Sequence, residues 1–413
     1  MKKRNRLYSW SRLLLWTHVV GVISFYITLW LRTSPNGVKQ AKANCAQKPA
    51  PGDVKPLVSI IVPARNEQRN IHRCVTSLLE QDYENYEVIV VDDDSTDDTP
   101  RILDNIIQTH PHGNRLWVLR LRELPPGWAG KPHALHAGVQ ESNGEWLLFT
   151  DADTWHAPNS LRCGLALAMD KGLDLLSLGT EQVLPDFWGR VMMPMAYLGI
   201  SMLYPPKKVN DPLSSIAIAN GQYILIRRAV YDRIGGYARP ELRSTLIDDR
   251  DLARVVKEQG FRLKLEDGRG LVQVYMYHGL RDTWRGWRKN VFLGSRGGLA
   301  FFFLMLIGLP AVTVAPFLLP LLMWMSRRGE RRHVARKPVT PSEVGAAVLL
   351  EWVPLLAYRS WIDRELKVPW YYAFTHPLAG ALFEGILAQS AWRVLTRQGV
   401  DWRGRQYYHG KDG

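Results

Sequence analysis

A run of strand-forming residues ends in two carboxylates that are separated by one residue. The segment is EWLLFTDADTWHAP, residues 145–158, and the carboxylates belong to Asp151 and Asp153. Side chains two positions apart on a strand share a face, so these negative charges repel each other unless a positive charge lies between them. An acidic turn in solvent is one interpretation. The other is a site for a divalent cation that carries a diphosphate, because Mg²⁺ is usually bound by carboxylate and phosphate oxygens.

Two other polar loops also follow apolar, strand-like segments. PARNE, residues 63–67, follows one such segment, and VDDDSTDDT, residues 91–99, follows another. If the strands are parallel, these loops and the loop at Asp151 meet at the edge where open α/β sheets bind ligands. The sequence has no G-x-G-x-x-G or Walker motif to hold phosphates with backbone N–H groups. A bound diphosphate would therefore need a metal ion and basic side chains.

An acidic pair, Asp248 and Asp249, begins a segment with helical periodicity, DDRDLARVVKEQG. Carboxylates in the first turn stabilise a helix through its dipole, so helix stabilisation is one explanation of the pair. A carboxylate in an active site can also accept a proton as a general base. The two roles are compatible, because a helix that starts at the sheet edge presents its first turn to the ligand.

Short apolar segments alternate with helical patterns from residue 57 to about residue 293. This alternation predicts one α/β domain at 57–293, with a mostly parallel sheet and helices on both faces. Residues 33–56 are rich in Pro, Lys, Gly and Asn and are expected to form a linker.

Apolar segments flank this domain on both sides. Residues 1–32 contain an uncharged apolar run long enough to span a bilayer, which predicts a retained N-terminal anchor rather than a cleaved signal peptide. Residues 294–413 are predicted to be a C-terminal membrane-associated region. Its apolar run at 299–325 is interrupted by three prolines, and a re-entrant course is expected there. The weaker apolar stretches at 343–358 and 371–392 are open to three interpretations: spans, interfacial helices or soluble core helices.

The composition favours a membrane over nucleic acid as the partner of this basic chain. The formal net charge is +14, from 53 Lys and Arg against 39 Asp and Glu, and the chain has 16 Trp and 16 Tyr. Trp and Tyr concentrate where a protein crosses a membrane surface. No zinc-ligand spacing or RNA-binding sheet signature is present, so we expect no nucleic-acid partner.

Five motifs occur in order within residues 58–290: VSIIVPARNE, VIVVDDDSTDDT, GKPHALHAG, FTDAD and LIDDRDLARVVKEQGFRL. Together they resemble the family-2 inverting glycosyltransferases, which have the GT-A fold. The resemblance implies a metal site for Mg²⁺ or Mn²⁺ at Asp151 and Asp153, which would explain why two carboxylates stand side by side. It also implies a nucleotide site made of Pro63, Ala64, Glu67, Asp93, Lys131 and Asp151.

By the same resemblance, Asp249 is the base that takes the proton of the acceptor hydroxyl, with Asp248 where the family commonly has Glu. Acceptor contacts are implied at Asn220, Gly221 and Gln222. Processive members carry Q-x-x-R-W, but residues 281–290, RDTWRGWRKN, lack the Gln and offer Arg285 and Trp287 instead. These two are expected to contact the acceptor or, alternatively, to belong to an interfacial helix. The departure predicts transfer of a single sugar rather than polymer synthesis.

The stretches LYPPKKVNDP, NGQYILIRR, STLIDDRDLA and VDWRGRQY resemble members associated with hopanoid and carotenoid biosynthesis. The expected reaction is therefore transfer from a nucleotide-diphosphate sugar, in the first instance a UDP-sugar, to a lipid hydroxyl or carboxylate. Because nucleotide sugars are cytosolic, we expect the α/β domain to face the cytoplasm at the cell membrane. The alternative enzyme is a polyprenyl-phosphate sugar synthase. A nucleotidyltransferase and a non-catalytic membrane scaffold are alternatives of other classes.

Overall fold

A seven-stranded sheet forms the centre of the α/β domain in the computed structural model, which describes residues 2–33, 55–294, 298–329, 339–396, 398, 400–402 and 405–407. Most of the predicted linker, 33–56, lies outside these residues. The strand order is β3-β2-β1-β4-β8-β6-β9, and within this sheet β8 alone runs antiparallel to the others. The predicted α/β class with a mostly parallel sheet is confirmed. The strands are β1 Val58–Ala64, β2 Tyr86–Asp93, β3 Leu116–Leu121, β4 Trp146–Phe149, β6 Leu175–Gly179, β8 Ile224–Arg227 and β9 Leu263–Asp267.

Helices cover both faces of this sheet, as the alternating pattern predicts. Successive side chains of a strand point to opposite faces, so Ile60 and Val62 of β1 enter one core and Ile61 enters the other. A Cβ on Gly138 would lie 2.6 Å from the Ile61 Cγ2 atom, so glycine permits the close approach of α5 to the sheet. The first face carries α3 Ile71–Leu79, α4 Thr99–Thr109 and α6 Ser160–Asp170, and the second carries α5 Gly130–Gln140, α9 Arg228–Arg233 and α11 Asp248–Glu258.

A second, three-stranded sheet starts directly after Asp153. Its order is β5-β10-β7, with β5 at Thr154–His156, β10 at Val272–Val274 and β7 at Glu181–Gln182. The backbone N–H of Tyr275 donates to the carbonyl of Asp153 at 3.0 Å, so the end of β10 holds the acidic loop. The remaining short elements of the described chain are η1 Gly113–Arg115, α8 Pro206–Val209, η2 Gly236–Ala238, α10 Pro240–Arg243, β11 Val400–Trp402 and β12 Arg405–Tyr407.

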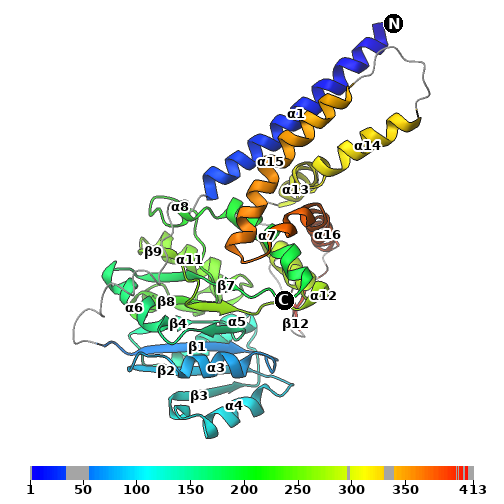
Figure 1. Cartoon of the computed structure of the whole chain (residues 1–413). Coiled ribbons are helices and arrows are strands. Elements are labelled where there is room, and N and C mark those ends of the chain that lie inside the picture. Colours follow the sequence, from blue (N-terminus) through cyan, green and yellow to red (C-terminus); the bar gives the residue numbers. More distant parts are fainter. Residues whose placement is uncertain are drawn as a thin grey trace.

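A layer of helices stands beside the α/β domain, and part of it projects away from the domain (Figure 1). Figure 1 shows α1 and α15 side by side along this projection, and the two helices are in contact. One apolar core joins α1, α7, α12, α15 and α16, so α7 packs with the helical layer although it lies within the predicted domain 57–293. The helices are α1 Lys2–Thr33, α7 Phe187–Leu203, α12 Gly279–Gly294, α13 Gly298–Thr313, α14 Ala315–Gly329, α15 Pro341–Glu365, η3 Trp370–Thr375 and α16 His376–Leu395.

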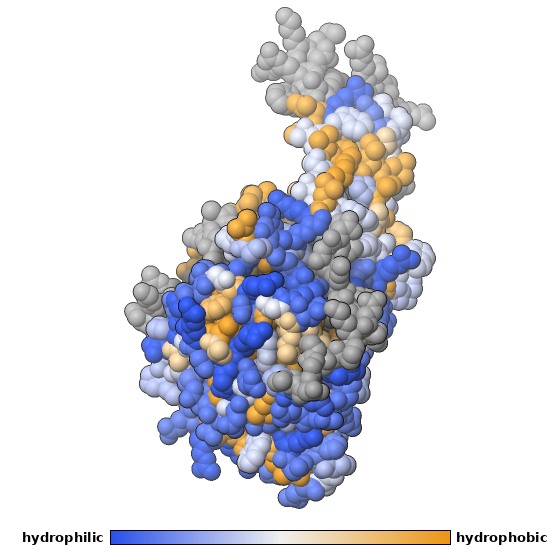
Figure 2. All heavy atoms as spheres, turned by 90° about the vertical axis from the view of Figure 1, so that its left-hand side faces the viewer, coloured by the Kyte–Doolittle hydropathy of each residue, from blue (hydrophilic) through white to orange (hydrophobic). Residues whose placement is uncertain are grey.

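The projecting helices expose apolar side chains to their surroundings (Figure 2). Residues 12–33 of α1 have the length and mean hydropathy, 1.7, of a membrane-spanning segment, and most of this segment is not covered by protein. Helices α13 and α14 meet the same test only as a pair, bent by 63° between Thr313 and Ala315. This bend falls within the proline-interrupted run 299–325, whose re-entrant course stays a prediction.

Side chains of α1 occupy the break between α13 and α14. Pro316 has no N–H, so the carbonyl of Val312 lacks the partner that an unbroken helix would supply. The Tyr26 hydroxyl donates to that carbonyl at 3.1 Å. The Nε2 atom of His18 lies 2.8 Å from the Ala311 carbonyl, and its Nδ1 atom lies 2.7 Å from Glu351 of α15. The Tyr26 hydroxyl thus satisfies the Val312 carbonyl, which Pro316 leaves without a helical hydrogen bond.

A buried ion pair within α15 lies against α7. The Nε atom of Arg359 lies 2.8 Å from Asp363 Oδ1, and both side chains are almost completely inaccessible. The guanidinium also donates from Nη2 to the Arg190 carbonyl at 3.2 Å. Because a buried charge is costly without its partner, Asp363 stabilises the guanidinium of Arg359. The bond from this guanidinium to the Arg190 carbonyl then joins α15 to α7.

We expect Asp363→Asn to lower the free energy of unfolding by about 3–5 kcal/mol, because the change leaves the Arg359 charge buried without a counter-ion. The matched control is Glu258→Gln on α11, which removes a partner at the same spacing from an exposed pair with Arg254. It should cost less than about 1 kcal/mol. Thermal unfolding of the purified proteins in detergent measures both, and equal losses would contradict the role of the buried pair.

Candidate active site

Three loops converge at the carboxyl ends of β1, β2 and β4. In the register of the sheet Ala64 of β1 lies opposite Asp92 of β2. The backbone N–H of Thr150, just after β4, donates to the Ile61 carbonyl at 3.2 Å. The predicted residues of PARNE, of the triple-Asp loop and of the Asp151 loop therefore lie along one edge, where the topology of an open α/β sheet forms its ligand crevice.

Hydrogen bonds connect the first two loops to each other. The backbone N–H of Glu67 donates to Thr99 Oγ1 at 2.8 Å, and that of Asn66 donates to Ser95 Oγ at 2.9 Å. Asn66 and Asp94 adopt left-handed backbone conformations, with φ of 55° and 58°. Asn and Asp tolerate this region better than most other side chains. The two loops thus form one preorganised wall of the crevice.

The side chains of Glu67 and Asp93 are buried in this wall. Glu67 accepts a hydrogen bond from the Asn70 amide at 3.2 Å, at the start of α3. The guanidinium of Arg65 contacts the Asp93 carbonyl and lies 3.6 Å from Asp94 Oδ2. The roles of Pro63, Ala64, Glu67 and Asp93 in nucleotide binding stay predictions, but the structure places all four at this edge.

A single ammonium group lies between two of the predicted acidic residues. Lys131, the second residue of α5, places Nζ 2.8 Å from Asp151 Oδ1 and 3.1 Å from Asp248 Oδ2. Burial opposes the charged form of the lysine, but the carboxylates of Asp151, Asp248 and Asp249 outweigh it and raise its pKa. The structure therefore brings the Asp151 loop and the predicted base region together through one side chain.

Asp249 lies in the first turn of α11 and faces this cluster. Its Oδ2 atom accepts the backbone N–H of Gly221 at 3.1 Å, and its Oδ1 atom accepts that of Arg250 at 2.7 Å. Burial and the neighbouring charge of Asp248 raise the pKa of Asp249 to about 6, although Lys131 and the two N–H groups act in the opposite direction. A carboxylate of this pKa can accept a proton near neutral pH.

A third acidic residue, Asp251, makes contacts that stabilise the first turn of α11. Asp251 is buried and pairs with the guanidinium of Arg250 at 3.0 Å. It also accepts a hydrogen bond from Thr245. Helix α11 begins at Asp248 as predicted, and the role of this acidic pair as a general base stays a prediction. Asp251 fastens the turn, while Asp248 and Asp249 face the cluster.

Gly221 lies where the cluster converges. A Cβ at this position would be 3.1 Å from Lys131 Nζ, 3.4 Å from Asp249 Oδ2 and 3.5 Å from Asp151 Oδ2. The flanking amides shape the loop: Asn220 Nδ2 donates to the Leu178 carbonyl at 3.0 Å, and the buried Gln222 accepts from Thr180. The acceptor contacts predicted for these three residues stay predictions.

The cluster suits a divalent cation bound with a diphosphate. Asp151, Asp248 and Asp249 are three carboxylates around one ammonium, that of Lys131. Mg²⁺ typically takes one or two carboxylates plus substrate phosphates. Among the described residues no group of three or more His, Cys, Asp or Glu forms a complete protein cage for a metal. These carboxylate oxygens are of the kind that bind an ion shared with a ligand, and Asp151 and Asp153 stay the predicted protein ligands of such an ion.

The two residues predicted on α12 lie in different surroundings. Trp287 is buried in the helical core, with its ring 5.8 Å from that of Phe383 on α16. Arg285, two positions earlier, is exposed. Trp287 therefore packs inside the helical layer, and both the acceptor role of the two residues and the interfacial-helix interpretation stay predictions.

Sequence reasoning missed one side chain beside the cluster, Tyr237. Its ring is fully buried, 5.6 Å from Phe149 and 6.0 Å from Tyr231. Its hydroxyl has no hydrogen-bond partner within the described part of the chain. Burial, and then the negative charge of Asp248, raise its pKa. The local sequence signal is the Gly-Gly-Tyr at residues 235–237, which follows α9.

Comparison with known proteins places this site in a family. Residues 59–235 match the model of Glycosyl transferase family 2. The chain therefore contains a family 2 glycosyltransferase domain, as the order of its motifs predicts. The matched region includes both acidic loops, Lys131 and Gly221, and it ends before α11.

Two curated relatives and one solved structure extend this result. A beta-monoglucosyldiacylglycerol synthase of Nostoc sp. is 29% identical over 256 residues, 60% of this chain, so the chain spans about half (50%) of that relative. A 4,4'-diaponeurosporenoate glycosyltransferase of Staphylococcus aureus is 26% identical over 86% of this chain and 89% of its own length. The structure of mannosyltransferase PcManGT from Pyrobaculum calidifontis, in complex with GDP-Man and Mn²⁺, is 20% identical with a TM-score of 0.50 over 93% of this chain and 97% of that one. The last likeness shows the shared fold, and the predicted GT-A fold is confirmed.

We expect Lys131→Met to lower the free energy of unfolding by about 1–3 kcal/mol, because it leaves neighbouring carboxylates without their ammonium. Mg²⁺ or Mn²⁺ should recover part of this loss by supplying the missing positive charge. Lys55→Met, which removes an exposed pair with Glu84, is the matched control and should change little. Thermal unfolding with and without metal measures both variants, and a metal-independent loss would contradict the electrostatic explanation.

Proposed function

We propose that this chain transfers one sugar, with inversion, from a nucleotide-diphosphate sugar to a lipid acceptor at the cell membrane. The observation that carries the proposal is the junction of Asp249 with the Asp151 and Lys131 pair at the ligand edge of the sheet. We infer that Asp249 is the proton acceptor and that Lys131 neutralises the phosphate charge, since the polar atoms of both side chains lie next to Gly221.

In the proposed step the acceptor oxygen forms a bond to the anomeric carbon while the bond from that carbon to the diphosphate breaks. The Asp249 carboxylate takes the proton of the acceptor hydroxyl, which makes the oxygen a stronger nucleophile. The Lys131 ammonium lies where it can stabilise the negative charge that develops on the departing diphosphate. A divalent ion held by Asp151 and Asp153 would supply further charge neutralisation when bound.

The lipid acceptor is supported by the relatives and by the helical layer. The two curated relatives are named for a diacylglycerol product and for a carotenoid acid, both lipids. Residues 12–33 of this chain meet the length and hydropathy of a span. We propose that this helix anchors the protein and that the α/β domain faces the cytoplasm, where nucleotide sugars are made. The solved neighbour binds a nucleotide sugar with Mn²⁺, which supports the donor class without choosing the sugar or the base.

We expect Asp249→Asn to reduce kcat by about 10²–10⁴-fold while donor affinity changes little, because the amide cannot accept the proton. In the parent enzyme the rate should fall as the pH drops below about 6, because the active form of Asp249 is the carboxylate and its pKa is about 6. Glu258→Gln, at the other end of α11, is the control. Nucleotide release with a lipid extract as acceptor measures the rate. A fully active Asp249→Asn enzyme would favour an acceptor that is already anionic, as in a polyprenyl-phosphate sugar synthase.

We expect Asp151→Asn/Asp153→Asn to abolish metal-dependent binding of nucleotide-diphosphate sugars, because two anionic ligands are replaced by neutral amides. Calorimetry with a UDP-sugar and a GDP-sugar, with Mn²⁺ or with a chelator, measures the affinity of parent and variant. Equal affinity in the presence and absence of metal would exclude the assigned metal role. An absence of nucleotide binding by the parent would exclude the enzyme itself.

A further inference from the structure

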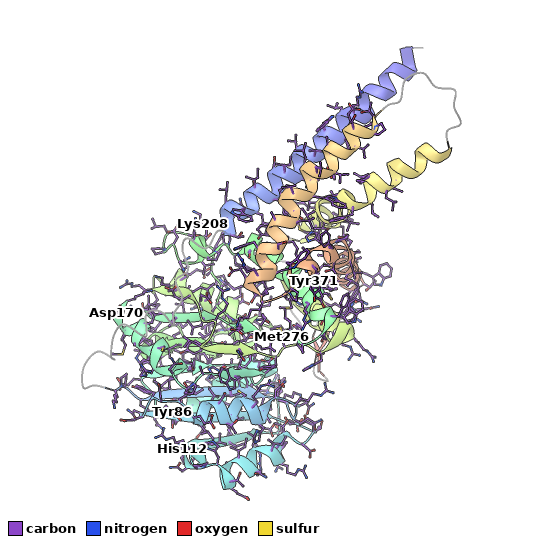
Figure 3. The ribbon with its side chains drawn as sticks, in the orientation of Figure 1. Tyr86, His112, Asp170, Lys208, Met276 and Tyr371 are labelled. Atoms are coloured by element: carbon purple, nitrogen blue, oxygen red, sulfur yellow. The ribbon has the colours of Figure 1, made fainter. Side chains whose placement is uncertain are left out.

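Three large aromatic side chains are exposed together where the helical layer meets the α/β domain. Trp370, Tyr371 and Phe374 of η3 are each more than half exposed. They form one patch, since the ring of Trp370 lies 6.2 Å from that of Tyr371 and 6.3 Å from that of Phe374. Figure 3 shows Tyr371 on the side of the helices, far from Tyr86 and His112 at the opposite end of the domain.

Local sequence fixes the direction in which this patch faces. Helix α15 ends with Lys367 in a left-handed conformation, φ 55°, and Pro369 follows. The backbone N–H of Val368 donates to the Asp363 carbonyl at 2.7 Å, and that of Lys367 donates to the Arg364 carbonyl at 3.1 Å. This is the Schellman arrangement of a helix C-terminus, here formed without glycine.

The buried side of η3 is attached to α7. The ring of Tyr372 lies 5.8 Å from that of Phe187, and the guanidinium of Arg190 lies 5.9 Å from the centre of the Tyr372 ring. Tyr372 therefore holds the short helix in place while its neighbours remain exposed. The patch is a fixed feature of the surface.

The chemistry of the surroundings matches the headgroup region of a bilayer. The outward face of α15 is apolar at Leu349, Leu350 and Val353, which are exposed. Towards its C-terminus the helix becomes charged, and the exposed Lys367 lies directly before η3. Trp and Tyr concentrate at this boundary between apolar and polar surroundings, and basic side chains there attract anionic lipids.

A chain of contacts links the patch to the acidic loop. Lys367 Nζ lies 2.6 Å from Glu181 Oε1 on β7. Glu181 is in register with Gln273 of β10, and the residue after β10, Tyr275, donates to the Asp153 carbonyl at 3.0 Å. A second tie joins Arg269 to the Glu365 carbonyl at 3.1 Å. The three-stranded sheet thus connects the end of α15 to the carboxylate cluster without a flexible segment.

We propose that η3 is an interfacial anchor. Trp370, Tyr371 and Phe374 enter the headgroup layer of the bilayer, and the ties through Lys367 and Glu181 hold the acidic cluster at a fixed height above it. The proposal deepens the function proposed above and rests on it for the lipid acceptor. The position of η3 in the bilayer can be measured without any sugar transfer.

The test compares two tryptophans of similar exposure at opposite ends of the protein. Trp370 is 69% exposed, and Trp117 of β3, at the far edge of the sheet, is 64% exposed. Each is replaced in the full chain by cysteine, Trp370→Cys or Trp117→Cys, and labelled with an environment-sensitive fluorophore. The parent chain measures background labelling. The proteins are reconstituted into liposomes of phosphatidylethanolamine and phosphatidylglycerol without any sugar donor. The quencher is either a nitroxide lipid labelled near the headgroup or aqueous iodide.

The label at Trp370→Cys is expected to emit at shorter wavelength, to be quenched by the nitroxide lipid and to be protected from iodide. The label at Trp117→Cys should show the opposite. If the parent floats with the liposomes but both labels respond alike to iodide, the anchor proposal is overturned while membrane attachment stands. If the parent does not float, membrane attachment and the anchor both fail.

A separate variant tests the contact between Lys367 and Glu181 that links η3 to the acidic cluster. Lys367→Met is expected to leave the Trp370→Cys label in the headgroup layer while turnover of a membrane-embedded lipid falls more than turnover of a detergent-dispersed acceptor. Lys55→Met should leave both rates unchanged. An equal fall with both acceptors would show that Lys367 affects the domain as a whole and would overturn the height-setting role.

Discussion

Repulsion among carboxylates at one end of the sheet is the constraint on which the rest of the active region depends. The acidic side chains of Asp151, after β4, and of Asp248 and Asp249, at the start of α11, meet around the ammonium of Lys131. Such a cluster is stable only when the fold holds its members in place and when cations meet their charge. Burial, and then the negative charge of Asp248, raise the pKa of Asp249, and a proton on this carboxylate relieves part of the repulsion.

Each element of the domain contributes one part of this cluster. Strand β4 ends just before Asp151, α5 begins beside Lys131, and α11 begins at Asp248. Gly221, just before β8, supplies an N–H to Asp249 and leaves the space that a side chain would fill. The antiparallel β8 matters here, because its reversed direction brings the start of the strand to the edge where the parallel strands end.

The helical layer follows a related principle, because several of its buried polar groups are paired. The break between α13 and α14 is filled by Tyr26 and His18, and the charges of Arg359 and Asp363 are buried as a pair. Many exposed side chains on the same helices are apolar (Figure 2). The three-stranded sheet connects this layer to the acidic loop, because Glu181 of β7 pairs with Lys367 and Tyr275, after β10, donates to the Asp153 carbonyl. In the proposed anchor, the contacts of the helical layer with the bilayer therefore fix the position of the acidic loop.

The sequence by itself determined the class of the domain, the edge at which its ligand site lies and the identity of its acidic residues. Strand periodicity and residue type are local properties, so the β1 and β2 runs and the Asp151 loop could be read directly. Only the tertiary structure decided which charges meet, because the contact of Lys131 with Asp248 joins residues far apart in the chain. It also decided that Tyr237 lies beside the acids, that Trp287 packs in the helical core, and that α7 belongs to that core. Burial and pairing arise from the packing of distant elements, which no local pattern records.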